Sequence, residues 1–238
     1  MYREIAPPTG IAAHVASVWT RGPEPAERAH RIVPDACADI VWITGRRLLV
    51  AGPSTGPVVS TIPRADLEAV WGDAGAALAA RLAAAPTLDT AVAILTAAVE
   101  RRLPPPEAID PVVRAAAVGA ARPRTPVEAL GAGLGIGERQ LRRRFDDAVG
   151  YGPKTLQRVL RFQRFLALAE AERAPGAADP DLAQLAFAAG YADQAHLTRE
   201  CTRLAGLPPA ALLATGAGPG GERSPEFAPV AAPPVLAA

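Results

Sequence analysis

Two stretches of the C-terminal half decide the fold: TPVEALGAGLGIGERQLRRRFDDAVG (125–150) and DPDLAQLAFAAGYADQAHLTRECTRLAG (179–206). In each stretch, a short apolar helix pattern leads through glycine into a second helix whose apolar residues recur every three or four positions. The tight turn between two helices favours glycine, which stands at Gly133 and Gly135 in the first stretch and at Gly190 in the second. Each stretch therefore predicts a helix-turn-helix unit.

The first unit has the signals of a helix start followed by an amphipathic second helix. Thr125 offers a capping hydroxyl, and Pro126 suits the first helical position. In the second helix, which begins near residues 137–138, Leu141, Phe145 and Ala148 cluster on one side at 100° per residue. We expect these three side chains to face the core.

Three arginines share the opposite side of this second helix, namely Arg139, Arg142 and Arg143. An exposed arginine triad on a short helix after a sharp turn suits the major groove, where arginine bonds guanine O6 and N7 in bidentate fashion. Asp146 shares that face, either to accept from a cytosine amino group or to orient a neighbouring arginine. The alternative is an ordinary solvated charged face, which the turn and the core pattern disfavour.

Basic charge is concentrated around the first unit, although the whole chain carries a net charge of only +1. Residues 135–165 contain eight basic and three acidic residues. Such a local cationic patch suits nucleic-acid phosphates and predicts salt-dependent binding. We expect Lys154, Arg158 and Arg161 to contact phosphates, together with backbone amides at the helix starts.

The second unit is close to electrically neutral, which predicts fewer and weaker base contacts. Its second helix is expected to begin near Asp193 and to bury Leu197, Cys201 and Leu204. The side chains on the opposite side of this helix are Ala195, His196, Arg199 and Arg203.

Together, GIGERQLRRRFDDAVGYGPKTL (135–156) and LAQLAFAAGYADQAHLTRE (182–200) resemble the DNA-binding domain of AraC/XylS-type transcription regulators. The most specific signature is Gly-Tyr-x-Asp-Gln-x-His-Leu-x-Arg, which runs from Gly190 to Arg199. The resemblance covers about residues 112–213. It implies two helix-turn-helix modules that are joined by a long helix, about 153–173, and enter successive major grooves. The base-contacting positions that it implies are Arg139, Arg142 and Arg143 in the first unit and Gln194, Ala195, His196 and Arg199 in the second.

Two positions depart from that family's pattern. Cys201 stands where an aromatic residue is usual, and Gly137 stands where serine or a similar capping residue is usual. A smaller side chain at position 201 predicts a shallower or repacked core under the second recognition helix. Ala195 is too short to hydrogen-bond a base edge.

The N-terminal half is expected to be β-like over residues 1–62 and helical over residues 66–102. Thr87 or Asp89 is expected to open the second of these Ala-rich helices. YREIAPPTGIAAHVASVWT (2–20) and RIVPDACADIVWITGRRLLVAGPSTGPVV (31–59) resemble an uncharacterised domain that often precedes this DNA-binding domain in actinobacterial regulators. The resemblance implies a shortened domain for effector binding or dimerisation.

The chain is thus expected to be an α+β protein, mostly α. A β-rich, then helical domain spans 1–102, a Pro-rich linker 103–111, the double helix-turn-helix domain 112–214 and a disordered tail 215–238. Two cysteines, with neither a signal peptide nor a membrane-length apolar run, are typical of a cytoplasmic protein.

The expected function is sequence-specific transcription regulation, with no catalytic residues, cofactor or metal. The alternative is a cupin-like small-molecule or metal-binding protein, or enzyme, without DNA function. Its candidate ligands are His14, His30, Asp35, Cys37 and Asp39, whose spacing fits no standard metal motif. A redox sensor at Cys37 and a protein-interaction module over 66–102 are further alternatives. The expected partner is double-stranded DNA, and no association with a membrane is expected. Further candidate partners are RNA polymerase, a small-molecule effector and a second copy of the chain.

Overall fold

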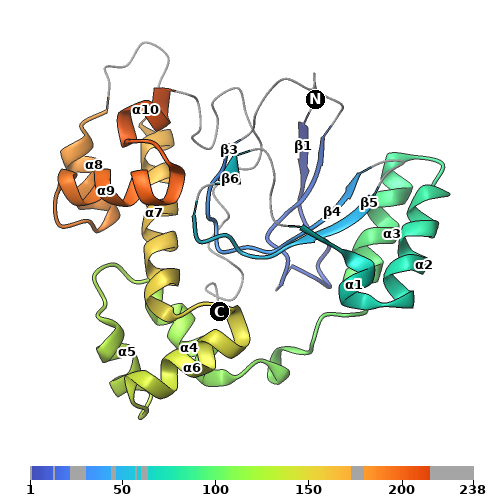
Figure 1. Cartoon of the computed structure of the whole chain (residues 1–238), viewed down its shortest axis with the longest axis horizontal. Helices are drawn as coiled ribbons and strands as arrows, with labels where there is room; N and C mark the ends of the chain where they lie inside the picture. Colours follow the sequence, from blue (N-terminus) through green and yellow to red (C-terminus); the bar gives the residue numbers. More distant parts are fainter. Residues whose placement is uncertain are drawn as a thin grey trace.

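The computed structural model describes residues 2–12, 14–21, 31–43, 47–56, 58–59, 64–172 and 180–214. Among these residues, strands and three helices make up the N-terminal part, and helices alone make up the C-terminal part (Figure 1). The chain is therefore α+β and mostly α, as the sequence predicts. The expected tail, 215–238, lies outside the described residues.

The strands of the described N-terminal residues form three small antiparallel sheets. β1 (Tyr2–Ile5) pairs with β2 (Val18–Arg21), and β3 (Arg31–Ile32) pairs with β6 (Val58–Val59). The largest sheet has the order β4 (Asp39–Ile43), β5 (Arg47–Ala51) and β7 (Arg64–Asp66). In this sheet Trp42 lies opposite Leu48, and Val41 lies opposite Leu49.

Three helices continue from the last strand and share a core with the largest sheet. They are α1 (Leu67–Trp71), α2 (Asp73–Ala83) and α3 (Leu88–Glu100). Leu48 of β5 belongs to the same apolar cluster as Leu78 and Leu82 of α2. The expected start of α3 is confirmed, because the Thr87 hydroxyl accepts a hydrogen bond from Thr90 N at 3.1 Å.

A one-turn helix, η1 (Pro106–Ala108), interrupts the Pro-rich segment before the helical part begins. The helices that follow are α4 (Pro111–Ala120), α5 (Val127–Gly133), α6 (Glu138–Val149), α7 (Pro153–Ala171), α8 (Leu182–Ala189), α9 (Gln194–Ala205) and α10 (Pro209–Ala214). Among the described residues, no helix is both long and apolar enough to cross a bilayer.

The 19-residue helix α7 is the common scaffold of the C-terminal part (Figure 1). Its first turns contribute Leu156 to a core with Leu141 and Phe145 of α6. Its later turns contribute Phe162 and Phe165 to a second core with α8, α9 and α10. One long helix therefore carries a separate apolar core for each helix-turn-helix unit.

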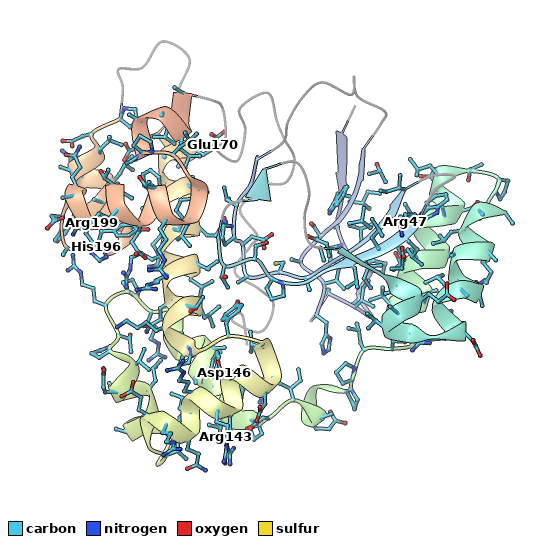
Figure 2. The ribbon with its side chains drawn as sticks, viewed as in Figure 1. Arg47, Arg143, Asp146, Glu170, His196 and Arg199 are labelled. Carbon is cyan, nitrogen blue, oxygen red and sulfur yellow. The ribbon has the colours of Figure 1, made fainter. Side chains whose placement is uncertain are left out.

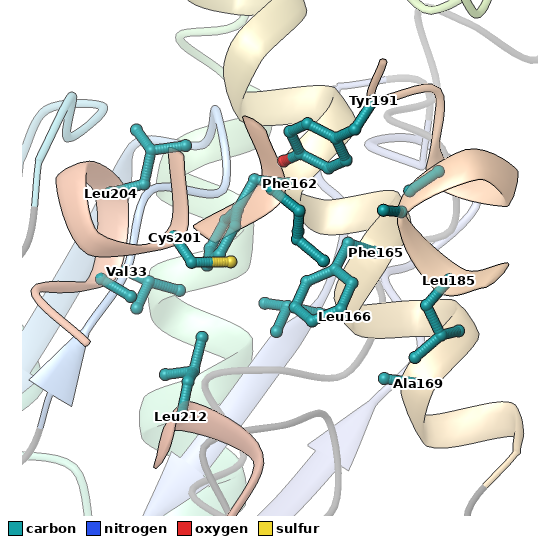
Figure 3. Packing of buried hydrophobic residues seen from close by; sticks show 14 residues of the cluster. Val33, Phe162, Phe165, Leu166, Ala169, Leu185, Tyr191, Cys201, Leu204 and Leu212 are labelled. Carbon is teal, nitrogen blue, oxygen red and sulfur yellow. The ribbon is translucent and has the colours of Figure 1, made fainter. Parts of the chain in front are cut away.

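The second core is completed by a residue from the N-terminal part. Val33, only 3% exposed, belongs to the same cluster as Cys201, Leu212 and Phe162 (Figure 3). The small Cys201 side chain itself is fully buried. The core around Cys201 thus includes an aliphatic side chain from the segment between β3 and β4.

Candidate nucleic-acid interface

The turn of the first unit depends on a close approach between α5 and the chain that follows it. Ile136 N donates to Gly131 O at 3.0 Å, and a Cβ added at Gly131 would lie 2.8 Å from Ile136 O. The turn therefore requires glycine at Gly131, and at Gly135, whose φ is 69°. Gly133 lies inside α5 with open space around its Cα, so nothing in the structure requires glycine there. The Thr125 hydroxyl does not cap α5, because the helix begins one residue later than expected, with Pro126 as its N-cap residue.

Helix α6 has one buried side and one exposed basic side. Leu141 and Phe145 are fully buried, as predicted. The prediction for Ala148 is wrong, because its side chain is exposed and Val149 packs against the core instead. The difference arises in the last turn, where the helix ends at the left-handed Gly150. The exposed side presents Arg139, Arg142 and Arg143.

The exposed arginines differ in their partners inside the protein. Arg142 Nε lies 3.6 Å from Asp146 Oδ2, so this carboxylate orients a neighbouring arginine. Arg139 and Arg143 have no ion-pair or hydrogen-bond partner among the residues that the structure describes. The neighbouring Arg144 turns away from this group and donates to both carboxylate oxygens of Asp110, at 3.1 and 3.3 Å. The unit thus offers two unpaired guanidinium groups and one oriented by a carboxylate.

The second unit also consists of two helices joined by a glycine turn, and its second helix, α9, has a side-chain cap at its N-terminus. Gly190, at φ 94°, adopts the left-handed conformation that ends α8, and Tyr191 N donates to Ala186 O at 2.9 Å. The expected start of α9 is confirmed, because the carboxylate of Asp193 accepts from His196 N at 2.6 Å. The N-terminus of α9 is therefore stabilised by the side chain of its N-cap residue, Asp193.

The base-contacting candidates of α9 lie on its outer side, while Leu197, Cys201 and Leu204 are buried as predicted. Gln194 and Arg199 are exposed or half-exposed on that side. His196 is half-buried, with its ring edge against Tyr191 at a centroid distance of 5.2 Å. Figure 2 shows His196 and Arg199 on the outer side of the second unit and Arg143 on the outer side of the first.

The basic residues of α7 fall into two groups. Lys154, the only lysine in the chain, is exposed in the first turn and has no partner among the described residues. Arg158 Nε lies 3.5 Å from Glu200 Oε2 in α9, and the Arg161 guanidinium lies 5.5 Å from the centre of the Tyr191 ring. Arg158 and Arg161 thus have partners within the protein, and their expected phosphate contacts stay predictions.

One contact of the scaffold helix was missed by the sequence reasoning. Gln163 Nε2 donates to Pro34 O at 2.7 Å, next to the buried Val33. Ala36 of the same segment packs against the core of the first unit. The segment 33–36 therefore touches α7 and both cores, although no sequence motif marks it.

The described residues of the N-terminal part provide little support for a metal or thiol site. No group of three or more His, Cys, Asp or Glu side chains among the described residues has a geometry that could hold a metal ion. His30 lies outside those residues. Burial and, to a smaller extent, the charges of Asp35 and Asp39 together raise the pKa of the Cys37 thiol to about 12. A thiolate-based sensor at Cys37 is therefore disfavoured at neutral pH.

Two helix-turn-helix units lie on one scaffold helix, and the second helix of each unit has an exposed polar side. The profile of a helix-turn-helix domain family matches residues 130–215, and that of a domain of unknown function matches residues 3–70. No curated protein and no solved structure gave a significant match. The C-terminal part thus matches a helix-turn-helix domain of the AraC type and the N-terminal part an uncharacterised domain, which supports a DNA-binding transcription regulator.

Proposed function

We propose that this regulator reads a bipartite DNA site, with α6 in one major groove and α9 in the next. The observation that carries the proposal is the pair of recognition helices on the single scaffold helix α7. Each has a buried apolar side and an exposed side with groups that can bond bases. Successive major grooves on one face of B-DNA lie about 34–36 Å apart. Helix α7, with 19 residues, is about 28 Å long, which suits units at this separation.

In the first groove, Arg139 and Arg143 are the candidates for direct base readout. Both are exposed on α6 and have no competing partner among the described residues, so binding a guanine breaks no ion pair inside the protein. Arg142 is held toward Asp146, which restricts its direction and favours a single contact geometry. Each bidentate contact between arginine and guanine contributes about 1–3 kcal/mol of discrimination against the wrong base.

In the second groove, Gln194, His196 and Arg199 are the candidates for base readout. Gln194 lies at the start of α9, the part of a recognition helix that reaches base edges first. His196 is the most constrained of the three, because it packs on Tyr191 and its Nδ1 accepts from Ala192 N at 3.5 Å. Ala195, between Gln194 and His196, has no side-chain donor, so α9 has fewer strong hydrogen-bond donors than α6. We expect the second unit to contribute less to DNA affinity.

The phosphate contact best supported by the structure is Lys154. Its ammonium group is exposed in the first turn of α7, directly after α6, and meets no internal partner among the described residues. Losing one phosphate contact makes the negative slope of log K against log salt less steep by about 0.9. The expected contacts with RNA polymerase, an effector and a second copy of the chain stay predictions.

The experiment that tests this function measures binding of the full chain to its selected site and to single-base variants of that site. Arg143→Ala should weaken binding to the best site by about 1–3 kcal/mol and relax preference at one base of the first half-site only. Arg199→Ala should relax preference in the second half-site only. Arg81→Ala, which removes an exposed arginine of α2, is the matched control and should change neither.

Two results would refute the assignment of the recognition helices. Arg143→Ala could weaken all sequences equally, which would place Arg143 on a phosphate rather than a base. Alternatively, Arg143→Ala and Arg199→Ala could alter preference at the same base pairs, which would contradict the reading of two separate grooves.

A further inference from the structure

Arg164, in the middle of α7, joins the two helix-turn-helix units directly. Its Nη2 donates to Ala121 O at 2.6 Å, and its Nη1 donates to Ala189 O at 3.5 Å. Ala121 is the C-cap residue of α4 in the first unit, and Ala189 is the last residue of α8 in the second. One planar guanidinium group therefore binds the carbonyl end of a helix from each unit.

Both carbonyl groups are suited to a cation. The last carbonyls of a helix have no partner within the helix, and the helix dipole makes that end negative. Burial, and the nearby charge of Arg161, lower the pKa of Arg164, as expected for a guanidinium that has lost part of its water. Arginine keeps its charge even so, and the two carbonyls replace the lost hydration.

Further contacts join the same two units beside Arg164. The Arg124 guanidinium lies 4.4 Å from the centre of the Phe187 ring, which links the segment before α5 to α8. Gln157 Nε2 of α7 donates to Thr125 O at 2.7 Å and holds that segment against the scaffold. Phe187 is 66% exposed and has no place in the core, so its contact with Arg124 does not simply follow from apolar burial.

We propose that Arg164, assisted by the contact between Arg124 and Phe187, is a positioning brace that fixes α6 relative to α9 and so sets the spacing accepted between the two half-sites. The proposal rests on the bipartite reading above. One added base pair moves a half-site by about 3.4 Å and rotates it by about 34–36°, so a rigid pair of units accepts one spacing and rejects its neighbours. Without the brace, the units are held by their own packing on α7 and by the segment 33–36, which packs against both cores.

The test compares the full chain and its variants on duplexes whose half-sites are separated by the selected spacing or by one base pair more or less. The wild-type chain should prefer one spacing by about tenfold or more. Arg164→Met keeps an unbranched apolar stem but donates no hydrogen bonds, and should reduce this preference to about threefold or less. Arg164→Lys keeps the charge but lacks the two terminal nitrogens that bind two carbonyls. Its spacing preference should lie between those of the wild-type chain and Arg164→Met.

Two further variants separate positioning from folding. Phe187→Ala changes an exposed side chain, should leave the melting temperature unchanged and should reduce the spacing preference partially. Arg114→Met, at an exposed arginine of α4, is the matched control and should keep the wild-type preference. A variant that is merely destabilised would weaken binding to all spacings by the same factor, and that result would overturn the brace.

A measurement without DNA gives an independent readout. Nitroxide labels at A129C in α5 and A183C in α8, both exposed, report the distance between the units in a chain whose native cysteines are replaced by alanine. The brace predicts a narrow distance distribution that broadens in Arg164→Met, and an unchanged distribution would overturn it.

The DNA selection distinguishes failure of the brace from failure of the proposed function. If the wild-type chain selected only one short DNA sequence, both the bipartite reading and the spacing role would be refuted. A bipartite site with equal affinity at all spacings would refute the brace alone.

Discussion

Replacing Arg158 by alanine is expected to lower the free energy of unfolding by about 1–3 kcal/mol. Glu200 lies in the second recognition helix with its side chain 11% exposed, and its Oε2 is 3.5 Å from Arg158 Nε. This oxygen accepts no hydrogen bond among the described residues, so the charge of Arg158 is what compensates its burial. Removing one partner of a fully buried pair costs about 3–5 kcal/mol, and the 30% exposure of Arg158 places the cost below that range.

The assay is urea unfolding of Arg158→Ala, Glu200→Gln and the double variant at neutral pH. Because the neutral amide that replaces the carboxylate no longer needs a cation, Arg158→Ala should cost less in the Glu200→Gln background, with a coupling energy of about 1 kcal/mol or more. Arg81→Ala should change stability by less than about 0.5 kcal/mol. Two results together would show that Arg158 is a phosphate ligand and not the partner of Glu200. They are a coupling energy near zero and, in Arg158→Ala, a slope of log K against log salt that is less steep by about 1.

Three other predictions follow from single contacts and burial. DNA should protect Lys154, the only lysine, from an amine-acylating reagent, and mass spectrometry that finds equal acylation with and without DNA would contradict its phosphate contact. Val33→Ala should destabilise the chain by about 1–3 kcal/mol in a urea titration, whereas Val70→Ala, at a valine 58% exposed, should have little effect. Burial raises the pKa of Cys37 and of Cys201 to about 12, so the folded chain keeps protons that the unfolded chain loses. The free energy of unfolding should therefore fall by about 2–3 kcal/mol from about pH 8 to about pH 10, and alanine at both positions should flatten this fall.

Much of the C-terminal fold could be predicted because its signals are local. The three-to-four spacing of Leu141 and Phe145, and of Leu197 and Cys201, identifies the buried sides of α6 and α9 from the sequence alone. Ala148 shows the limit of this reasoning, because a helix wheel does not include the point where a helix leaves the core.

The partners of the basic residues could not be predicted in the same way. The local excess of positive charge is plain in the sequence, but the spacing of Arg158, Arg161 and Arg164 does not distinguish exposed cations from those engaged inside the protein. Arg164 binds main-chain carbonyls, which every residue carries and which therefore leave no mark in the sequence. The contact of Gln163 with Pro34 was missed for the same reason, across 129 positions of chain.

The central claim is that two recognition helices read two grooves, and selection of the full chain against randomised duplex DNA at two salt concentrations tests it most directly. Reading by both helices should enrich a bipartite site whose half-sites are centred about 10–10.5 base pairs apart, with retention that falls as salt rises. Enrichment of one short block would contradict the reading by α9, and salt-sensitive retention without any enriched sequence would contradict specific recognition by either helix.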